Sequence, residues 1–110
     1  MIATAKLRYL GVSAQKTRLV VDQVRGQNVN DALAILRYSR KLVARDLRKL
    51  VQSAVANAQQ AYPNVDVDGL VITRAQVDQA PPMKRARAQS MGRIFPVLKR
   101  ACHVTVGLDI

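Results

Sequence analysis

A run of basic residues lies between two segments with the composition of β-strands, and this arrangement limits the folds that the chain can adopt. The run, PPMKRARAQSMGRIFPVLKR at residues 81–100, carries six Lys or Arg side chains and no carboxylate. Gln89, Ser90 and Gly92 near its middle favour a turn, so we expect the chain to reverse there and form a β-hairpin. With about ten residues in each strand, this hairpin would project by roughly 30 Å. Because a two-stranded ribbon is not stable alone in water, we expect a binding partner to order it.

The segments around the hairpin predict further strands. In residues 98–110 apolar side chains recur at every second position, interrupted only by Arg100, which predicts a half-buried strand. These apolar positions are Leu98, Cys102, Val104, Val106, Leu108 and Ile110. Residues 65–78 are rich in β-branched side chains, and their alternation slips near Gly69, which is typical of a bulge or bend. Residues 2–10 predict a short strand at the edge of a sheet.

Three helices are predicted in the first half of the chain. Ser13 is a good N-cap for a helix over residues 14–25, and Asn30 for a shorter helix that ends near residue 37. A third helix is expected over residues 39–62, because apolar side chains recur there in steps of three and four. The apolar positions of the first helix are Leu19, Val20, Val21 and Val24, with Gly26 to end it. Those of the third are Val43, Leu47, Leu50, Val51, Ala54, Val55 and Ala58.

The charge of the chain predicts a polyanionic partner. Eighteen Lys and Arg residues against seven acidic residues give a formal net charge of +11. Such a charge indicates nucleic acid or an anionic membrane surface as the partner. Arg outnumbers Lys, which favours bidentate binding of phosphates. The basic face at residues 40–49 fits solvent exposure or contact with nucleic acid; its apolar stripe lacks Trp and Phe and suits core packing better than a membrane.

The sequence predicts no enzyme, no cofactor and no metal site. Cys102 and His103 are adjacent, and neighbours along a strand point to opposite faces, so they cannot act as a nucleophile and its base. We interpret Cys102 as a small buried hydrophobe. With neither a secretion signal nor an apolar run of membrane-spanning length, we expect a soluble protein inside the cell.

The few aromatic residues allow two interpretations. Tyr9, Tyr38 and Tyr62 are expected to be partly buried packing residues. Phe95 and Met91 lie in the hairpin, where no core is expected. They would either stack or wedge against bases, or pack against each other across the ribbon.

Four segments of the chain resemble the universal large-subunit ribosomal protein twenty-two family, in its bacterial or organellar form. They are SAQKTRLV at 13–20, SAVANA at 53–58, PMKR at 82–85 and KRACHVTV at 99–106. The last two, with the spacing between them, are the most specific. The resemblance implies an α+β fold in which three helices pack on a small sheet and a long β-hairpin protrudes. We interpret residues 1–110 as a single domain, with residues 80–101 as an extended hairpin arm.

The resemblance also implies a function without catalysis. It implies a structural constituent of the large ribosomal subunit that binds large-subunit ribosomal RNA, supports assembly and lines the nascent-peptide exit tunnel with the hairpin. The implied partners are that RNA, neighbouring large-subunit proteins including the fourth at the tunnel, and the nascent peptide, with no membrane. The implied location is the ribosome, in the cytoplasm or in an organelle matrix or stroma. Charge and resemblance together assign RNA binding to Lys16, Arg18, Lys84, Arg85, Arg87, Arg93, Lys99, Arg100 and His103.

The tip of the hairpin departs from the family pattern. The family tip resembles Pro-Arg-Ala-Arg-Gly-Arg, whereas residues 88–93 read AQSMGR, so that only the final Gly-Arg is kept. The tunnel tip is therefore expected at Gln89, Ser90, Met91 and Gly92, with a more neutral surface.

Two other functions fit the sequence. One is an architectural DNA-binding protein with a β-ribbon arm in the minor groove. Such arms usually need a dimer to clasp the duplex, and the sequence has no surplus apolar helix face for one. The other is a protein that lies on a membrane surface.

Overall fold

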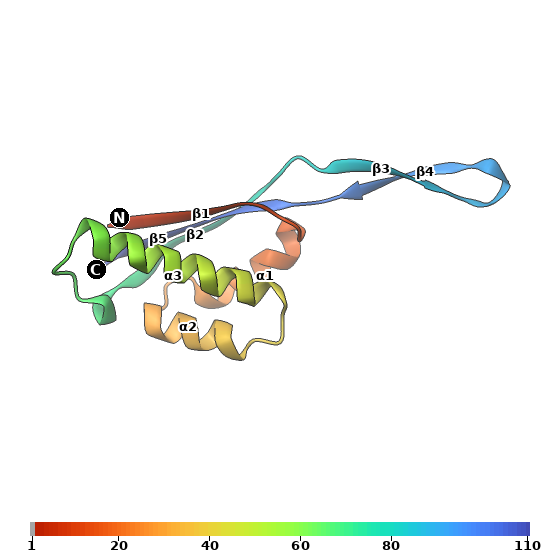
Figure 1. Ribbon diagram of the computed structural model, residues 1–110. Helices are drawn as coiled ribbons and strands as arrows, with labels where there is room; N and C mark the ends of the chain where they lie inside the picture. Colours follow the sequence, from red (N-terminus) through yellow and green to blue (C-terminus); the bar gives the residue numbers. More distant parts are fainter. Residues whose placement is uncertain (1) are drawn as a thin grey trace.

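Three helices cover one face of a three-stranded sheet, and a two-stranded hairpin projects far beyond this body (Figure 1). The structure is a computed structural model that describes residues 2–110. The elements are β1 (Ala3–Leu10), α1 (Ala14–Val24), α2 (Val29–Tyr38), α3 (Val43–Ala61), β2 (Val71–Gln79), β3 (Met83–Ala88), β4 (Ile94–Lys99) and β5 (Cys102–Asp109). The predicted α+β fold with a protruding hairpin is confirmed.

The sheet has the order β1-β5-β2 and is antiparallel throughout. The strand β5 is central, and its side chains on the helix side are at most 3% exposed: Cys102, Val104, Val106 and Leu108. The period-two prediction is therefore confirmed within β5, and the predicted edge position of β1 is confirmed too. The period-two prediction is wrong at both ends of residues 98–110. Leu98 belongs to β4 and is 42% exposed, and Ile110 is 82% exposed.

The helix ends agree only in part with the predicted caps. The Ser13 hydroxyl accepts a hydrogen bond from the Lys16 N–H at 3.4 Å, and Gly26 follows α1 with a φ of +81°, as expected. The predicted cap Asn30 is wrong: Asn28 caps α2, since its Oδ1 accepts from the Asn30 N–H at 2.9 Å. The third helix begins at Val43, four residues after Ser39, without a side-chain cap.

The core lies between the helices and the sheet, and α3 contributes most of its helical part. The predicted stripe of α3 is buried at every position except Val55, which is partly buried. On α1 the prediction is wrong for Leu19, which is 59% exposed. Thr17 lies in the core, where its hydroxyl donates to the Ser13 carbonyl oxygen at 3.0 Å and lies 3.4 Å from the Cys102 thiol. The interpretation of Cys102 as a buried small residue is confirmed.

The strand predicted over residues 65–78 begins later in the structure, at Val71. Residues 65–70 form a loop with a 3₁₀ turn over Val67–Gly69, and the strand begins at Val71. The Asp66 carboxylate accepts a hydrogen bond from the Asp68 N–H at 3.1 Å, which stabilises the turn against an extended chain. The shift in register falls between Ile72 and Arg74, not at Gly69.

The hairpin reverses where the turn residues predict. The strands β3 and β4 pair from Met83 with Lys99 to Ala88 with Ile94, six residues each rather than ten. All side chains of β3 are exposed, and in β4 only Val97 is partly buried. The radius of gyration is 17.1 Å, against about 13 Å for a compact domain of this size. The hairpin therefore lies outside the core.

Replacing residues 86–96 by Asn-Gly should leave the free energy of unfolding within about 1 kcal/mol of the full chain. Every residue removed is exposed, and the flanking pair, Arg85 and Val97, lies directly opposite in the ladder, where a two-residue turn fits. Urea unfolding followed by circular dichroism measures the change. Loss of a cooperative transition would contradict the assignment of residues 80–101 as an arm of a single domain, which stays a prediction.

Candidate nucleic-acid interface

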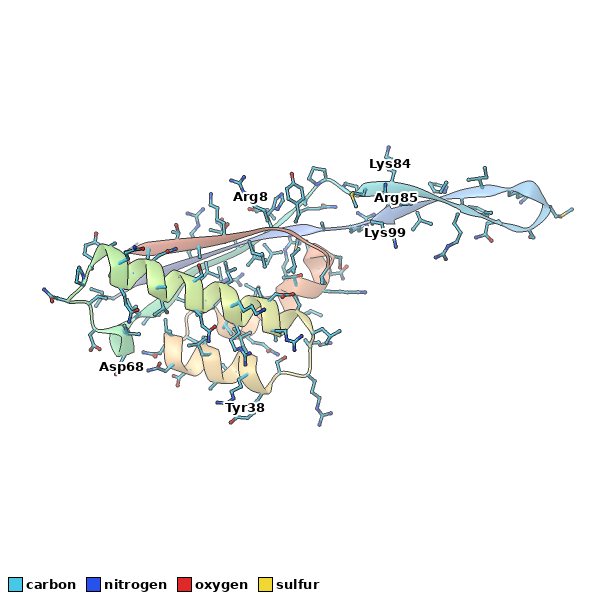
Figure 2. The ribbon with its side chains drawn as sticks, viewed as in Figure 1. Arg8, Tyr38, Asp68, Lys84, Arg85 and Lys99 are labelled. Carbon is cyan, nitrogen blue, oxygen red and sulfur yellow. The ribbon has the colours of Figure 1, made fainter. Side chains whose placement is uncertain are left out.

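The pairing of β3 with β4 sorts the hairpin side chains onto two faces. Residues opposite each other in a ladder share a face, as does every second residue along a strand. One face holds Met83, Arg85, Arg87, Phe95, Val97 and Lys99, and the other holds Lys84, Ala86, Ala88, Ile94, Pro96 and Leu98. Three of the four cations in these strands therefore lie on one face, and Lys84 projects from the opposite side of the ribbon to Lys99 (Figure 2). We call the face that holds Arg85, Arg87 and Lys99 the cationic face of the hairpin.

A groove of about 790 Å³ lies where the base of the hairpin meets the connection from β1 to α1. Its charged side chains are Lys16, Arg85, Lys99 and Arg100, which come from α1, β3, β4 and the residue after β4. No carboxylate of residues 2–110 lines this groove. Cations gathered in a concave surface without counter-charges attract anions from solution. We call this groove the basal groove.

Two smaller hollows continue the basal groove. One, of about 340 Å³, shares Arg100 with the groove and adds Arg18. The other, of about 260 Å³, lies on the face of the sheet that no helix covers, and it shares Tyr9 with the groove. It is lined by Lys6, Arg8, Tyr9, Asp78, His103 and Thr105. Arg8 points away from the helices there (Figure 2), so side chains from both ends of the chain form one basic surface.

The predicted RNA-binding residues differ in how far the fold engages them. The Arg18 guanidinium donates from Nη2 to the Val77 carbonyl oxygen at 2.9 Å, which fastens α1 to β2 and leaves its other N–H groups for a ligand. Arg85 donates from Nη1 to the neighbouring Lys84 carbonyl oxygen at 2.9 Å. Within the described part of the chain, no cation of the basal groove forms an ion pair. These charges are thus available to an external anion.

His103 contacts Tyr9, a residue that the sequence did not indicate as part of a site. The Tyr9 backbone N–H donates to Nδ1 of His103 at 3.0 Å, so the neutral imidazole carries its proton on Nε2. The two rings are perpendicular, with centroids 4.8 Å apart. Tyr9 is 68% exposed, Tyr38 79% and Tyr62 53%, so the prediction that the tyrosines are partly buried is wrong. The sequence gives one indication that Tyr9 is exposed: Leu10 follows it directly and breaks the alternation of apolar side chains in β1. In the structure Leu10 is buried.

The tip of the hairpin lies at the far end of the arm, away from the helices and the three-stranded sheet (Figure 1). Met91 and Gly92 turn the chain with positive φ values of 62° and 73°, and the Gln89 N–H donates to the Arg93 carbonyl oxygen at 2.7 Å. Met91 is 96% exposed, which excludes packing against Phe95 across the ribbon. Arg87 and Arg93 lie farther out than the cations of the groove.

The described residues contain neither a metal-binding cluster nor a membrane-crossing helix. Between residues 2 and 110, no group of three His, Cys, Asp or Glu side chains could hold a metal ion. None of the helices in this part of the chain has both the length and the apolar character to cross a membrane.

The fold and the interface define a class: small basic α+β proteins with an exposed hairpin arm. The chain belongs to the family described as ribosomal protein L22p/L17e, whose model matches residues 5–109. The resemblance read from the four sequence segments is confirmed. Members of this family are structural, non-enzymatic constituents of the large ribosomal subunit, and so is this protein.

Curated relatives support this membership over nearly the whole chain. A large ribosomal subunit protein uL22 of Syntrophus aciditrophicus is 48% identical over 109 residues, which cover 99% of this chain and 98% of the relative. The proteins of the same name from Anaeromyxobacter sp. (strain K) and Solibacter usitatus are 50% and 45% identical. Their matches cover 94% and 96% of this chain, and 71% and 94% of the relatives.

Proposed function

We propose that this protein binds large-subunit ribosomal RNA through the basal groove and the cationic face of the hairpin, and that it supports assembly of the subunit. The proposed contacts in these two places are Lys16, Arg85, Arg87, Lys99 and Arg100. Further proposed contacts are Arg18 and His103 in the two adjoining hollows, Lys84 on the opposite face of the hairpin, and Arg93 after its turn. Such binding would depend on the phosphates and on the shape of the folded RNA more than on its sequence. A protein that binds in this way would be located in the ribosome.

One observation carries the proposal. Four cations from α1 and from both ends of the basic run line a single groove that lacks carboxylates: Lys16, Arg85, Lys99 and Arg100. Without carboxylates nearby, these positive charges are not neutralised within the groove and attract polyanions. The exposed hairpin extends this positive surface by a further two cations, Arg87 and Arg93. A polyanion that follows both the groove and the hairpin would order the ribbon, which has no core of its own.

The tip of the hairpin is the part we propose for the exit tunnel. Gln89, Ser90 and Met91 carry no charge, so the tip would present a less positive wall to a nascent peptide than a tip with several arginines. The fourth large-subunit protein would be its neighbour there. This part of the proposal rests on membership of the family and on the exposure of the tip.

Sedimentation with ribosomes tests the proposal. A tagged copy of the protein, expressed in its own host, should sediment with large ribosomal subunits and remain bound after a high-salt wash. In a second assay, large-subunit ribosomal RNA transcribed from Syntrophus aciditrophicus should bind more tightly than duplex DNA at the same salt concentration. Preference for duplex DNA would instead favour an architectural DNA-binding protein. Binding to vesicles that persists after nuclease treatment would favour a membrane-surface protein.

A further inference from the structure

Tyr9 has a backbone conformation that turns its side chain out of the sheet. Leu7 pairs with Val104 and Leu10 pairs with Cys102, so two residues of β1, Arg8 and Tyr9, lie opposite the single residue between those partners on β5. Tyr9 has a φ of 57°, in the left-handed region that bulky residues rarely adopt. As a result Leu10 enters the core at 9% exposure, while the Tyr9 ring is 68% exposed.

The position does not require an aromatic residue for folding. Glycine or asparagine adopts a positive φ more readily than tyrosine, and the exposed ring buries little apolar surface. Residues held in such disfavoured conformations are concentrated at ligand-binding sites, where the surrounding structure fixes them. The ring at Tyr9 therefore points to a role outside the stability of the fold.

The ring is also held in a defined orientation. The Tyr9 N–H donates to Nδ1 of His103 at 3.0 Å, and the imidazole lies perpendicular to the phenol ring at 4.8 Å. A perpendicular contact uses either an edge of the phenol or one of its two faces, so at least one flat face remains for a ligand. Because the ring is already oriented, less entropy is lost when a flat ligand binds to it.

Cations surround the ring on two sides. Tyr9 lines both the basal groove, with Lys16, Arg85, Lys99 and Arg100, and the hollow on the open face of the sheet, with Lys6 and Arg8. One carboxylate, Asp78, lies in that hollow. An aromatic face between two cationic surfaces matches a nucleotide, whose flat base is flanked by phosphates before and after it.

We propose that Tyr9 is a stacking platform for one unpaired base of an RNA strand, with the phosphates on its two sides bound by the basal groove and by the Lys6–Arg8 hollow. This proposal rests on the proposed RNA-binding function and adds to it a binding residue and a requirement for an unstacked nucleotide. Proteins recognise single-stranded loops and bulges of RNA by stacking of this kind.

A fluorescence experiment tests the stacking directly. The chain contains no Trp, so the Tyr9→Trp variant has a single indole at the proposed platform. Titration with large-subunit ribosomal RNA from Syntrophus aciditrophicus should quench its fluorescence, because a base stacked on the indole is in direct contact with it. The matched control is Tyr38→Trp on α2, which is 79% exposed, against 68% for Tyr9, but lies on the helix side, away from the hairpin (Figure 2). No quenching at position 9 while the RNA binds, or equal quenching in both variants, would overturn the proposal.

Affinities of further variants separate stacking from charge and from folding. Tyr9→Phe should bind the same RNA within about twofold of the unchanged protein, whereas Tyr9→Leu and Tyr9→Asn should bind about 5- to 150-fold more weakly. The salt dependence should stay the same in all three variants, because no phosphate contact is removed. Asn tolerates the left-handed conformation at position 9, so the Tyr9→Asn variant should remain folded. Thermal unfolding checks this.

Two results would contradict the platform. If Tyr9→Leu binds as tightly as Tyr9→Phe, the ring acts only as apolar bulk. If Tyr9→Asn binds like the unchanged protein while removal of the groove cations weakens binding, RNA is bound without the platform. If the unchanged protein itself prefers duplex DNA, the proposed function fails, and that failure is seen before any Tyr9 variant is compared.

Discussion

Replacement of Lys16, Arg85, Lys99 and Arg100 by Ala should weaken the binding of large-subunit ribosomal RNA and flatten its dependence on salt. Each phosphate contact that is lost lowers the slope of log K against log salt by about 0.7 to 0.9, so four contacts lower it by roughly 3. Between about 50 and 200 mM salt, the variant should then lose roughly 50- to 150-fold less affinity than the unchanged protein loses. Filter binding at several salt concentrations measures both slopes. Because the four side chains line a groove and not the core, the fold should be kept.

A second variant removes the same number of charges from α2, from α3 and from the connection between them. Arg37, Arg40, Lys41 and Arg45 are all exposed, and none of them lines the basal groove. Their replacement by Ala changes the net charge equally, so it measures the general attraction of a basic protein for a polyanion. Its salt slope should stay within about one unit of the unchanged slope. Equal flattening in both variants would mean that net charge, and not the groove, binds the RNA, or that the basic face at residues 40–49 also contacts it.

The elements that the sequence predicts best are those whose signal is averaged over many residues. The stripe of α3 runs from Val43 to Ala58, and a single exception such as Val55 does not change its interpretation. The same is true of β5, where four alternate side chains are fully or almost fully buried. The hairpin was predicted from composition, since a basic segment with turn residues between strands has few other folds available to it.

Features that depend on one dihedral angle or one distant contact could not be predicted. The bulge exposes Tyr9 and buries Leu10, yet no residue type at this position, such as glycine, indicates a bulge. The cap of α2 is Asn28 and not Asn30, because Asn28 can also donate from its amide to the Asp68 carbonyl oxygen, forty residues away in sequence, at 2.7 Å. Arg18 likewise binds the Val77 carbonyl oxygen across the helix–sheet junction, a contact that spacing along α1 does not reveal.

Charge in the sequence indicates some residues of the interface, but the fold determines which of them lie together. Arg85, Lys99 and Arg100 could be chosen from the basic run alone, because they are close in sequence. Two features of the fold add to this: the N-terminal end of α1 lies beside the base of the hairpin, so Lys16 lines the same groove, and the register of β3 with β4 puts Lys84 on the other face of the ribbon. Tyr9 lay outside the predicted site for the same reason.

Leu47→Ala should lower the free energy of unfolding by about 2 to 5 kcal/mol, the usual cost of a truncated and fully buried leucine. Leu47 lies on α3, is 2% exposed and belongs to the core between the helices and the sheet. A domain of this size is stable by only about 5 to 15 kcal/mol, so the loss should shift the urea midpoint strongly. The slope of the transition should not change if the variant still unfolds in one step.

Leu19→Ala on α1 is the matched control, because it makes the same substitution in a helix at a position that is 59% exposed. Leucine and alanine both favour helices, so the difference between the two variants reports burial and not helix propensity. We expect a loss below about 1 kcal/mol, since most of the Leu19 side chain is already in water. A loss as large as that of Leu47→Ala would mean that Leu19 packs in the core, as the apolar pattern of α1 suggests, and that Thr17 does not take its place. A small loss would instead confirm that α1 turns Thr17, with its bond to the Ser13 carbonyl oxygen, toward Cys102 and leaves Leu19 at the surface.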